Sequence, residues 1–232
     1  MAQPRKLHDR FFKQAKEEGY AARSAYKLKQ IQEKRHILKR GDRVIDLGCA
    51  PGSWVQVAGE MVGEKGRVGG IDLQEVTIEL PPHARTLVGD IFKTDALTLL
   101  KLATPDGQSP RLADVLLSDM APNTEGGAGG LGDHFRSIEL CRRVLELAPS
   151  LLRPGGNLAM KVFEGEAYPE LLKDTQKMFA EVKGYKPEAT RDVSREMFIV
   201  AKGLRAGVRV TPEAPTPGLA KPPPAPREGW GR

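Results

Sequence analysis

Short apolar runs alternate with amphipathic segments from Arg43 to about Lys202. The apolar runs are rich in Val, Ile and Leu and have the length and composition of buried strands. Helical segments between such strands are typical of a largely parallel sheet with helices on both faces, so the pattern predicts an α/β fold. The predicted strands are Arg43–Leu47, Arg67–Asp72, Thr86–Gly89, Val115–Ser118, Asn157–Val162, Glu181–Pro187 and Met197–Ala201.

Two helices are predicted in the second half of this pattern. Apolar residues recur at helical spacing over Phe135–Leu152, and Pro154-Gly155-Gly156 should end that helix. A further helix is expected over Tyr168–Phe179. The connection between the last two strands is too short for a helical crossover, so we expect an antiparallel hairpin at the end of the sheet.

The sequence outside this core divides into two flanks. Residues 1–40 mix aromatic and aliphatic side chains with basic ones, which predicts short amphipathic helices packed on the core. Residues 204–232 are rich in proline and should be disordered or polyproline-like. We therefore expect a basic helical extension over 1–40, one domain over 41–203 and a tail over 204–232.

Composition narrows the class of protein. The 40% hydrophobic content suffices for a core, and no run is long and apolar enough to span a membrane. The first residues lack the apolar stretch of a secretory signal, so we expect a cytoplasmic protein. The two cysteines and four histidines are scattered, which favours neither a disulfide framework nor a metal site.

The net charge of +6 is unevenly distributed along the chain. Residues 1–40 hold twelve Lys or Arg against four Asp or Glu, so the remaining residues together carry about −2. A concentrated positive charge is typical of proteins that bind a polyanion such as RNA. It is equally compatible with a basic, solvated helix face.

A glycine-containing turn follows the first predicted strand, in Asp46-Leu47-Gly48-Cys49-Ala50-Pro51-Gly52-Ser53-Trp54. Ligands of doubly wound folds bind at this edge of the sheet. The turn lacks the G-x-G-x-x-G spacing of a dinucleotide site. A carboxylate at Asp46 suits a ligand with cationic amino-acid and sulfonium groups, so S-adenosylmethionine fits better than NAD.

Two further acids end the next strands. Asp72 can accept hydrogen bonds from both hydroxyls of an adenosine ribose, and Asp90 lies where the adenine amino group is expected. Each acid alone is more often a helix cap or a turn former. Three acids at the ends of three successive strands, beside a glycine turn, favour a cofactor site.

A second set of polar residues carries candidate chemistry. Asp119 ends the fourth strand and precedes the glycine-rich segment 124–132, a plausible mobile lid. Lys161 lies in an apolar strand that should be central, where a snorkelling surface lysine is not expected. Glu196 begins the last strand, and Lys27 lies in the basic N-terminal segment.

These segments resemble the FtsJ/RrmJ family of ribose 2′-O-methyltransferases. The resemblance rests on the glycine turn at 46–54 and on Ser118-Asp119-Met120-Ala121-Pro122-Asn123, Met160-Lys161, Ser194-Arg195-Glu196 and Ser24-Ala25-Tyr26-Lys27-Leu28, and it runs in order from about Ala22 to Gly203. Cys49 and Ser53 depart from the small residues expected at their positions, and the tail lies outside the match.

The resemblance implies a Rossmann-like domain with a seven-stranded sheet. It also implies a catalytic tetrad and an S-adenosylmethionine site, with no metal. The tetrad is Lys27, Asp119, Lys161 and Glu196, and the expected cofactor residues are Asp46, Gly48, Pro51, Gly52, Trp54, Asp72, Asp90 and Asp119. As a hypothesis, Lys161 accepts or directs the proton of a ribose hydroxyl, while Asp119 and Glu196 hold the two lysines.

The implied substrate is a uridine of large-subunit ribosomal RNA, free or in the ribosomal subunit or its precursor, modified by a monomeric enzyme. Transfer RNA and a messenger cap also present ribose hydroxyls, and they stay open as substrates. Two alternatives come from other classes, a nicotinamide-dependent oxidoreductase and a non-catalytic RNA-binding protein. The missing glycine fingerprint speaks against the first, and the intact tetrad against the second.

Overall fold

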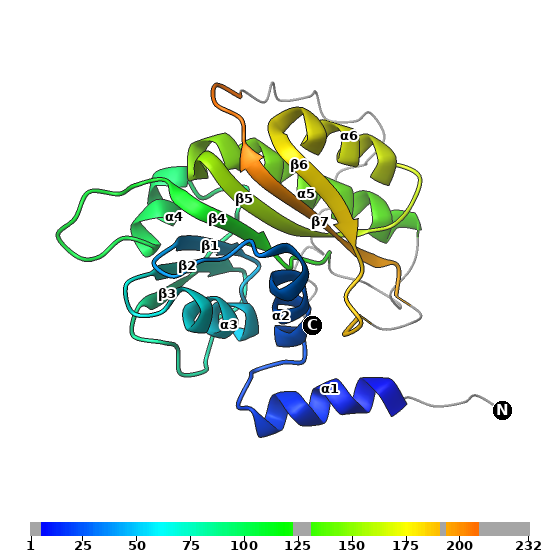
Figure 1. The fold of residues 1–232 in the computed structure, drawn as a ribbon, viewed down its shortest axis with the longest axis horizontal. Coiled ribbons are helices and arrows are strands. Elements are labelled where there is room, and N and C mark those ends of the chain that lie inside the picture. The colour runs from blue at the N-terminus through cyan, green and yellow to red at the C-terminus, as the bar shows by residue number, and fades with distance from the viewer. Residues whose placement is uncertain (1–5, 123–130, 191–193, 209–232) are drawn as a thin grey trace, which may run out of the picture.

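The computed structural model describes residues 6–122, 131–190 and 194–208. Its strands form one seven-stranded sheet in the order β3-β2-β1-β4-β5-β7-β6 (Figure 1). They are β1 (Arg43–Leu47), β2 (Arg67–Asp72), β3 (Ala84–Val88), β4 (Ala113–Ser118), β5 (Leu152–Phe163), β6 (Phe179–Tyr185) and β7 (Glu196–Leu204). β7 pairs antiparallel with both β5 and β6, and the other pairings are parallel. The predicted sheet and C-terminal hairpin are confirmed.

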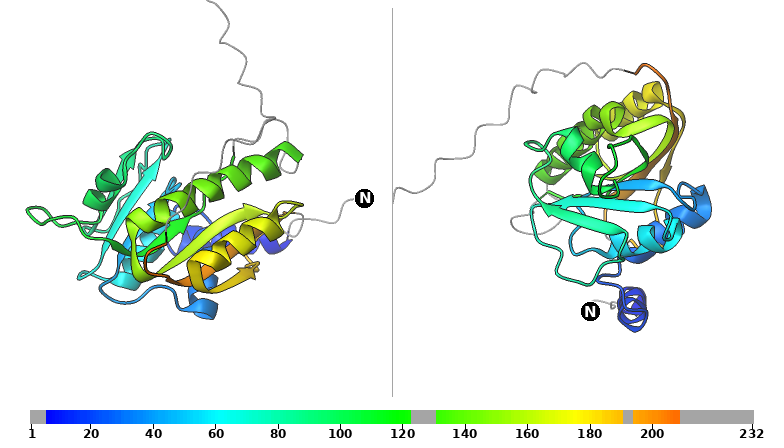
Figure 2. Two further views of the ribbon diagram at one scale, coloured as in Figure 1. Left: turned by 90° about the horizontal axis from the view of Figure 1, so that it is seen from above. Right: turned by 90° about the vertical axis from the view of Figure 1, so that its left-hand side faces the viewer.

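Helices cover both faces of the sheet (Figures 1 and 2). They are α1 (Lys6–Glu17), α2 (Ala25–Arg35), α3 (Ser53–Val62), α4 (Ala96–Leu102), α5 (Leu131–Leu151) and α6 (Tyr168–Met178). Residues of α4, α5 and α6 form one hydrophobic cluster with the sheet, and residues of α2 and α3 form another. Successive residues of β1 point to opposite faces of the sheet. Val44 packs in the cluster with α2 and α3, and Ile45 packs in the cluster with α4, α5 and α6.

The junction between α5 and β5 differs from the prediction. The helix ends at Leu151 and β5 begins at the next residue, so Pro154-Gly155-Gly156 lies within the strand. The pairing with β4 shifts register there, from Ala113 opposite Leu152 to Val115 opposite Asn157. Extra residues therefore bulge out of the ladder, and Gly155 takes a positive φ of 80° that a side chain would disfavour. The Pro-Gly-Gly sequence thus forms a bulge and does not end the helix.

The helical N-terminal region is present, but its two helices pack differently. Leu28 and Ile31 of α2 are fully buried against the sheet, so α2 is part of the main core. α1 rests on α2 chiefly through Phe11, whose ring centroid lies 5.4 Å from that of Tyr26. Phe12, the next residue along α1, is 60% exposed. The right-hand view of Figure 2 shows α1 protruding from the domain.

Two predicted segments fall wholly or mostly outside the described residues. One is the glycine-rich segment 124–132, expected to be a lid, of which residues 124–130 lie outside the described residues. The other is the proline-rich tail, of which residues 209–232 lie outside them.

Candidate active site

The parallel strands β1, β2 and β4 bring three acids to one edge of the sheet. Asp46 pairs in register with Gly70 and Leu117, and Asp72 and Asp119 each lie two residues beyond those partners. A cleft of about 730 Å³ opens at this edge. Its lining includes four of the predicted cofactor residues, Gly48, Asp72, Asp90 and Asp119, together with Leu73, Phe92 and Met120.

The carboxylates of Asp72 and Asp90 are held by backbone amides. Asp72 Oδ2 accepts a hydrogen bond from the Ala50 amide at 3.0 Å, and its Oδ1 accepts one from Gln74 at 2.9 Å. Asp90 Oδ1 accepts from the Phe92 amide at 2.9 Å. Each carboxylate oxygen has further acceptor capacity, so both groups can also bind donors of a ligand in the cleft.

Asp46 is a fully buried carboxylate, and neither of its oxygens has a hydrogen-bond partner among the described residues. Burial raises its pKa to about 8, with smaller contributions from the charges of Asp119 and Asp72. A buried, unsatisfied acid of this kind is costly to the folded protein. A cationic group bound nearby would favour its ionised form.

Gly48 is required by a close approach between two loops. Its φ is +81°, and a Cβ there would lie 3.0 Å from the backbone of Met120. Gly52 caps the start of α3 with a φ of 110°, and Pro51 precedes it in a cis peptide bond with Ala50. Neither Pro51 nor Gly52 lines the cleft; both shape the turn that forms one of its walls.

The structure does not bring the indole of Trp54 to the cleft. This side chain is buried and stacks on Phe198, with ring centroids 5.6 Å apart. Its Nε1 donates a hydrogen bond to the carbonyl of Ser24 at 2.8 Å. The hydroxyls of Ser24 and Ser53 lie 2.6 Å apart. Trp54 and Ser53 therefore tie the glycine turn to the segment that leads into α2.

The four predicted catalytic residues meet beside the cleft. Lys161 Nζ lies 2.9 Å from Asp119 Oδ1 and also donates to the Asp119 carbonyl. Lys27 Nζ lies 2.6 Å from Glu196 Oε1 and 4.0 Å from Asp119 Oδ1. Lys27, Lys161 and Glu196 are buried, and the Asp119 side chain is 15% exposed. The cluster is thus a chain of alternating charges, Glu196, Lys27, Asp119 and Lys161.

Strand geometry explains why α2 can supply one of these lysines. Lys161 follows Ala159 by two residues on β5, so both side chains lie on the sheet face that α2 covers. Lys27 enters from α2 and lies 5.8 Å from the centre of the Phe198 ring on β7. β5 lies between β4 and β7 in the sheet, as the sequence predicted for this lysine.

Two further polar residues contact Glu196. The Thr190 hydroxyl donates to Glu196 Oε1 at 3.3 Å, and the Glu196 amide donates to the Ser194 hydroxyl at 3.2 Å. Ser194 belongs to a motif already noted, but nothing in the sequence around Thr190 pointed to this contact. The contact of Thr190 with Glu196 arises only when the chain between β6 and β7 folds.

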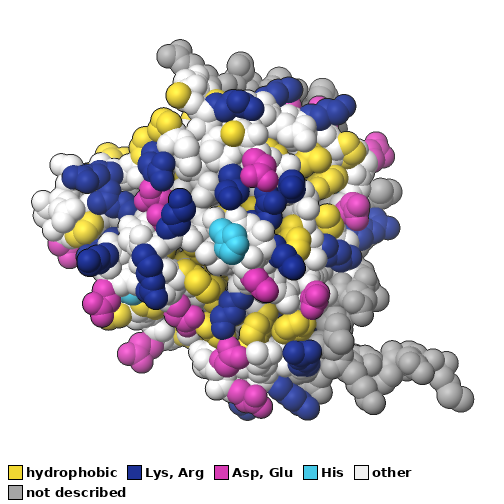
Figure 3. Space-filling view, viewed as in Figure 1, with side chains coloured by type: hydrophobic (Ala, Val, Ile, Leu, Met, Phe, Trp, Pro, Cys, Tyr) yellow, Lys and Arg dark blue, Asp and Glu magenta, His cyan; other side chains and the backbone are white. Residues whose placement is uncertain are grey.

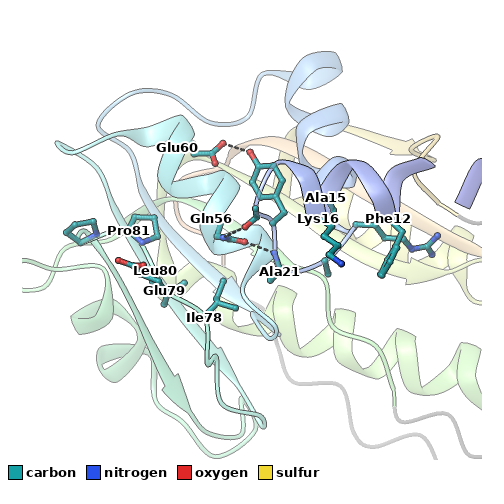
Figure 4. A pocket seen from close by; sticks show the side chains of 15 residues that line it. Phe12, Ala15, Lys16, Ala21, Gln56, Glu60, Ile78, Glu79, Leu80 and Pro81 are labelled. Carbon is teal, nitrogen blue, oxygen red and sulfur yellow. Dashed lines mark hydrogen bonds between the residues drawn. The ribbon is translucent and has the colours of Figure 1, made fainter. Parts of the chain in front are cut away.

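A separate groove of about 750 Å³ lies between α1, α3 and residues 78–82 (Figure 4). Tyr20 donates to Glu60 at 2.6 Å, and Gln56 bonds to both the Ala21 amide and the Gly19 carbonyl, which fixes the turn after α1. The exposed Phe12 lines the groove together with residues of both charges. This groove brings α1 next to the connection between β2 and β3.

Residues 20–204 match the family of FtsJ-like methyltransferases. The chain belongs to this family. It is 46% identical to the ribosomal RNA large subunit methyltransferase E of Methanothrix thermoacetophila, over 84% of this chain and 72% of that protein. The protein of the same name from Desulfosudis oleivorans is 42% identical, over 89% of this chain and 95% of its own length.

A solved structure extends the comparison to three dimensions. The crystal structure of a protein from Plasmodium falciparum described as a ribosomal RNA methyltransferase is similar to this one, with a TM-score of 0.66 and 27% sequence identity. The superposition covers 80% of this chain and 98% of that one. Within the described part of the chain, no group of three or more His, Cys, Asp or Glu could hold a metal ion. No helix in the described ranges is long and apolar enough to cross a membrane.

Proposed function

We propose that this protein methylates the 2′-hydroxyl of a ribose in large-subunit ribosomal RNA, with S-adenosylmethionine as the methyl donor and a uridine as the target nucleotide. The observation that carries the proposal is the buried cluster of Lys27, Asp119, Lys161 and Glu196 beside an acid-lined cleft. The family and the names of the relatives support the reaction and the class of RNA.

The cleft fits this cofactor by the chemistry of its side chains. Asp72 would hold the ribose hydroxyls and Asp90 the adenine amino group, while the exposed apolar side chains of Leu73 and Phe92 suit the faces of a purine. Asp46 and Asp119 would offset the positive charge of the methionine end. When bound, S-adenosylmethionine supplies a methyl group already activated by its sulfonium charge.

The protein must then orient the hydroxyl and manage its proton. Asp119 lines the cleft and contacts Lys161, so Lys161 lies where the cleft meets the charged cluster. In its neutral form Lys161 accepts the hydroxyl proton as the oxygen gains the methyl group, and in its charged form it orients the hydroxyl by donating a hydrogen bond to the hydroxyl oxygen. Glu196 holds Lys27, which in turn balances the charge of Asp119. Orientation contributes most of the rate, because the methyl donor is intrinsically reactive.

The N-terminal region would contact the RNA from the side of α2. Arg10 and Lys16 of α1 are exposed, and the exposed Phe12 lies between them in the sequence. Cations of this kind bind phosphates, and an exposed aromatic ring can stack on an unpaired base. Lys27 connects this region directly to the catalytic cluster.

Substitution of Lys161 tests the proposal. We expect Lys161→Ala to abolish methyl transfer to large-subunit ribosomal RNA, while the affinity for S-adenosylhomocysteine, measured by calorimetry, is retained. Lys161→Arg keeps the positive charge beside Asp119 but cannot release its proton, so it should also be inactive. Transfer is followed as tritium moved from methyl-labelled cofactor into the RNA.

The control is Lys173→Ala, which removes an exposed lysine of α6 far from the cluster and should leave transfer unchanged. Melting temperatures of all variants establish that they fold. Full activity of Lys161→Ala would remove this lysine from the mechanism. If Lys161→Arg were active and Lys161→Ala inactive, the positive charge of Lys161 would be required and proton transfer by this residue would not.

A further inference from the structure

A strongly positive hollow lies at the edge of the sheet opposite the candidate active site. It is formed where β1, β2 and β5 begin, together with the connection between α4 and β4, and has a volume of about 810 Å³. Its charged lining consists of Arg43, Lys65, Arg67, Arg111 and Arg153 against one carboxylate, Asp114. We call it the amino-edge hollow. Lys and Arg side chains are frequent on the left of Figure 3, over this edge.

Each oxygen of the hollow's single carboxylate already accepts a hydrogen bond. Asp114 Oδ1 accepts from Arg153 at 2.5 Å, and its Oδ2 accepts from the backbone amide of Arg43 at 2.9 Å. Arg67 donates to the carbonyls of Glu64 and Gly66. In the described ranges, no carboxylate pairs with the side chains of Arg43, Lys65 or Arg111. Among the described residues, the hollow thus carries more positive charge than its one carboxylate offsets.

The hollow is separate from the catalytic cleft. β1 has five residues, and at about 3.3 Å per residue it spans roughly 17 Å between the two edges. An RNA segment that places a ribose at Lys161 therefore does not reach the hollow without wrapping around the domain. The charge count along the sequence gives no hint of this surface, because residues 41–232 carry a net charge of about −2.

We propose that the amino-edge hollow binds phosphate groups of a second segment of the RNA substrate, remote from the target nucleotide. Four of its five cations are arginines, whose planar guanidinium groups match phosphate oxygens in pairs. The proposal rests on the proposed function, which makes RNA the partner of this protein. It implies that the substrate is an extended, folded RNA that contacts two edges of the domain.

Charge reversal of exposed cations in the hollow tests the idea. Lys65 and Arg111 are exposed and lie outside helices and strands, so Lys65→Glu and Arg111→Glu should fold normally. Lys173→Glu is the matched control, because it makes the same charge change on α6, away from the hollow. The probes are large-subunit ribosomal RNA, a short single-stranded oligoribonucleotide and polyglutamate, with affinities measured over a range of salt concentrations.

We expect both hollow variants to bind large-subunit RNA more weakly than Lys173→Glu does, with the slope of log affinity against log salt smaller by about one unit each. The loss should be greater on the large RNA than on the oligonucleotide. Affinity equal to that of Lys173→Glu would overturn the proposal. So would a loss of polyglutamate binding without a loss of RNA binding, which would assign the hollow to an acidic protein.

Methyl transfer by the unaltered protein is measured on the same RNA. Its absence would refute the proposed function, whereas the hollow is judged by RNA affinity alone, so the two failures are distinguishable.

Discussion

At the scale of one residue, Asp46 shows how a buried acid in the candidate site lowers the stability of the folded protein. Its raised pKa means that the folded protein holds a proton that the unfolded chain releases between about pH 4 and pH 8. Across this range the folded state binds more protons, so the free energy of unfolding falls as the pH rises. The decrease is roughly 1 kcal/mol per pH unit, and above about pH 8 the cost is fully present.

Asp46→Asn should remove this dependence. We expect the variant to be more stable than the unaltered protein, by a margin that grows from pH 5 to about pH 8, because an amide at this site carries no charge to bury. We also expect weaker binding of S-adenosylmethionine, whose positive charges would lose a counterion. Urea denaturation at a series of pH values and calorimetry of cofactor binding measure the two effects.

Asp42→Asn provides the control for Asp46→Asn. Asp42 also has a raised pKa caused by burial, but it lies at the opposite edge of the sheet, where it accepts a hydrogen bond from the Lys39 amide. Its substitution should leave cofactor affinity unchanged. If Asp46→Asn bound the cofactor as tightly as Asp42→Asn, Asp46 would have no place in the site.

The site was predictable from the sequence where it depends on strand ends. Parallel strands deliver Asp46, Asp72 and Asp119 to one edge, and that rule needs only the order of the elements. The contact of Thr190 with Glu196 depends on the path of a loop, which no local pattern specifies. The inward rotation of the Trp54 indole likewise depends on packing against Phe198.

At the scale of elements, the placement of α2 decides where Lys27 lies. The helix is buried through Leu28 and Ile31, and its start is fixed by the contacts of Ser24 with Ser53 and Trp54. These contacts join α2 to the first turn of α3, which follows the glycine turn directly. One wall of the cleft and Lys27 of the charged cluster are therefore held by the same junction.

Trp54→Phe should loosen this junction while keeping an aromatic ring against Phe198. The Ser24 carbonyl would lose its partner, which should lower the free energy of unfolding by about 1 to 3 kcal/mol. We expect the turnover number for methyl transfer to fall as Lys27 shifts, with a smaller change in cofactor affinity. Urea denaturation and steady-state kinetics measure both.

Ser53→Ala removes the neighbouring hydroxyl contact and serves as a comparison, with an expected cost of about 1 kcal/mol. If Trp54→Phe lowered stability but left turnover intact, the junction would be structural only, and Lys27 would be positioned by the burial of α2 itself.

The sequence predicted most of the elements but not two local features. The seven strands and the final hairpin follow from apolar runs and short connections. α4 was not predicted, since its seven residues ALTLLKL are too short and too apolar to show a helical period. The bulge at the start of β5 was missed because Pro-Gly-Gly after a helix is also typical of a helix stop.

At the scale of the whole molecule, charge in the sequence and charge in space are different quantities. The described cations within residues 1–40 do not form a single surface. Lys27 belongs to the buried cluster with Asp119 and Glu196, Lys29 pairs with Glu18 at 3.0 Å, and Arg35 pairs with Glu181 at 2.7 Å. Folding also assembles the amino-edge hollow from cations that are dispersed along an acidic stretch of sequence. RNA binding is therefore best tested surface by surface.

Deletion of residues 1–19 isolates the contribution of α1. The family match begins at residue 20, and α1 touches the rest of the chain mainly through Phe11 and Ala15, so the truncated protein should fold. A longer deletion through residue 35 would remove the buried side chains of α2 and unfold the domain. We expect the short deletion to weaken binding of large-subunit RNA and to reduce its salt dependence, because exposed cations are lost.

Combining this deletion with Lys65→Glu asks whether the two surfaces contact different RNA segments. If the two surfaces make separate contacts, the losses in binding free energy for large-subunit RNA caused by the deletion and by Lys65→Glu should add to within about 0.5 kcal/mol in the combined variant, because the sites share no partner. On a short oligoribonucleotide the deletion should account for most of the loss. Filter binding of the four proteins at several salt concentrations provides the measurement. A combined loss clearly smaller than the sum would mean that one RNA segment spans both surfaces, and that the domain is contacted along a continuous path.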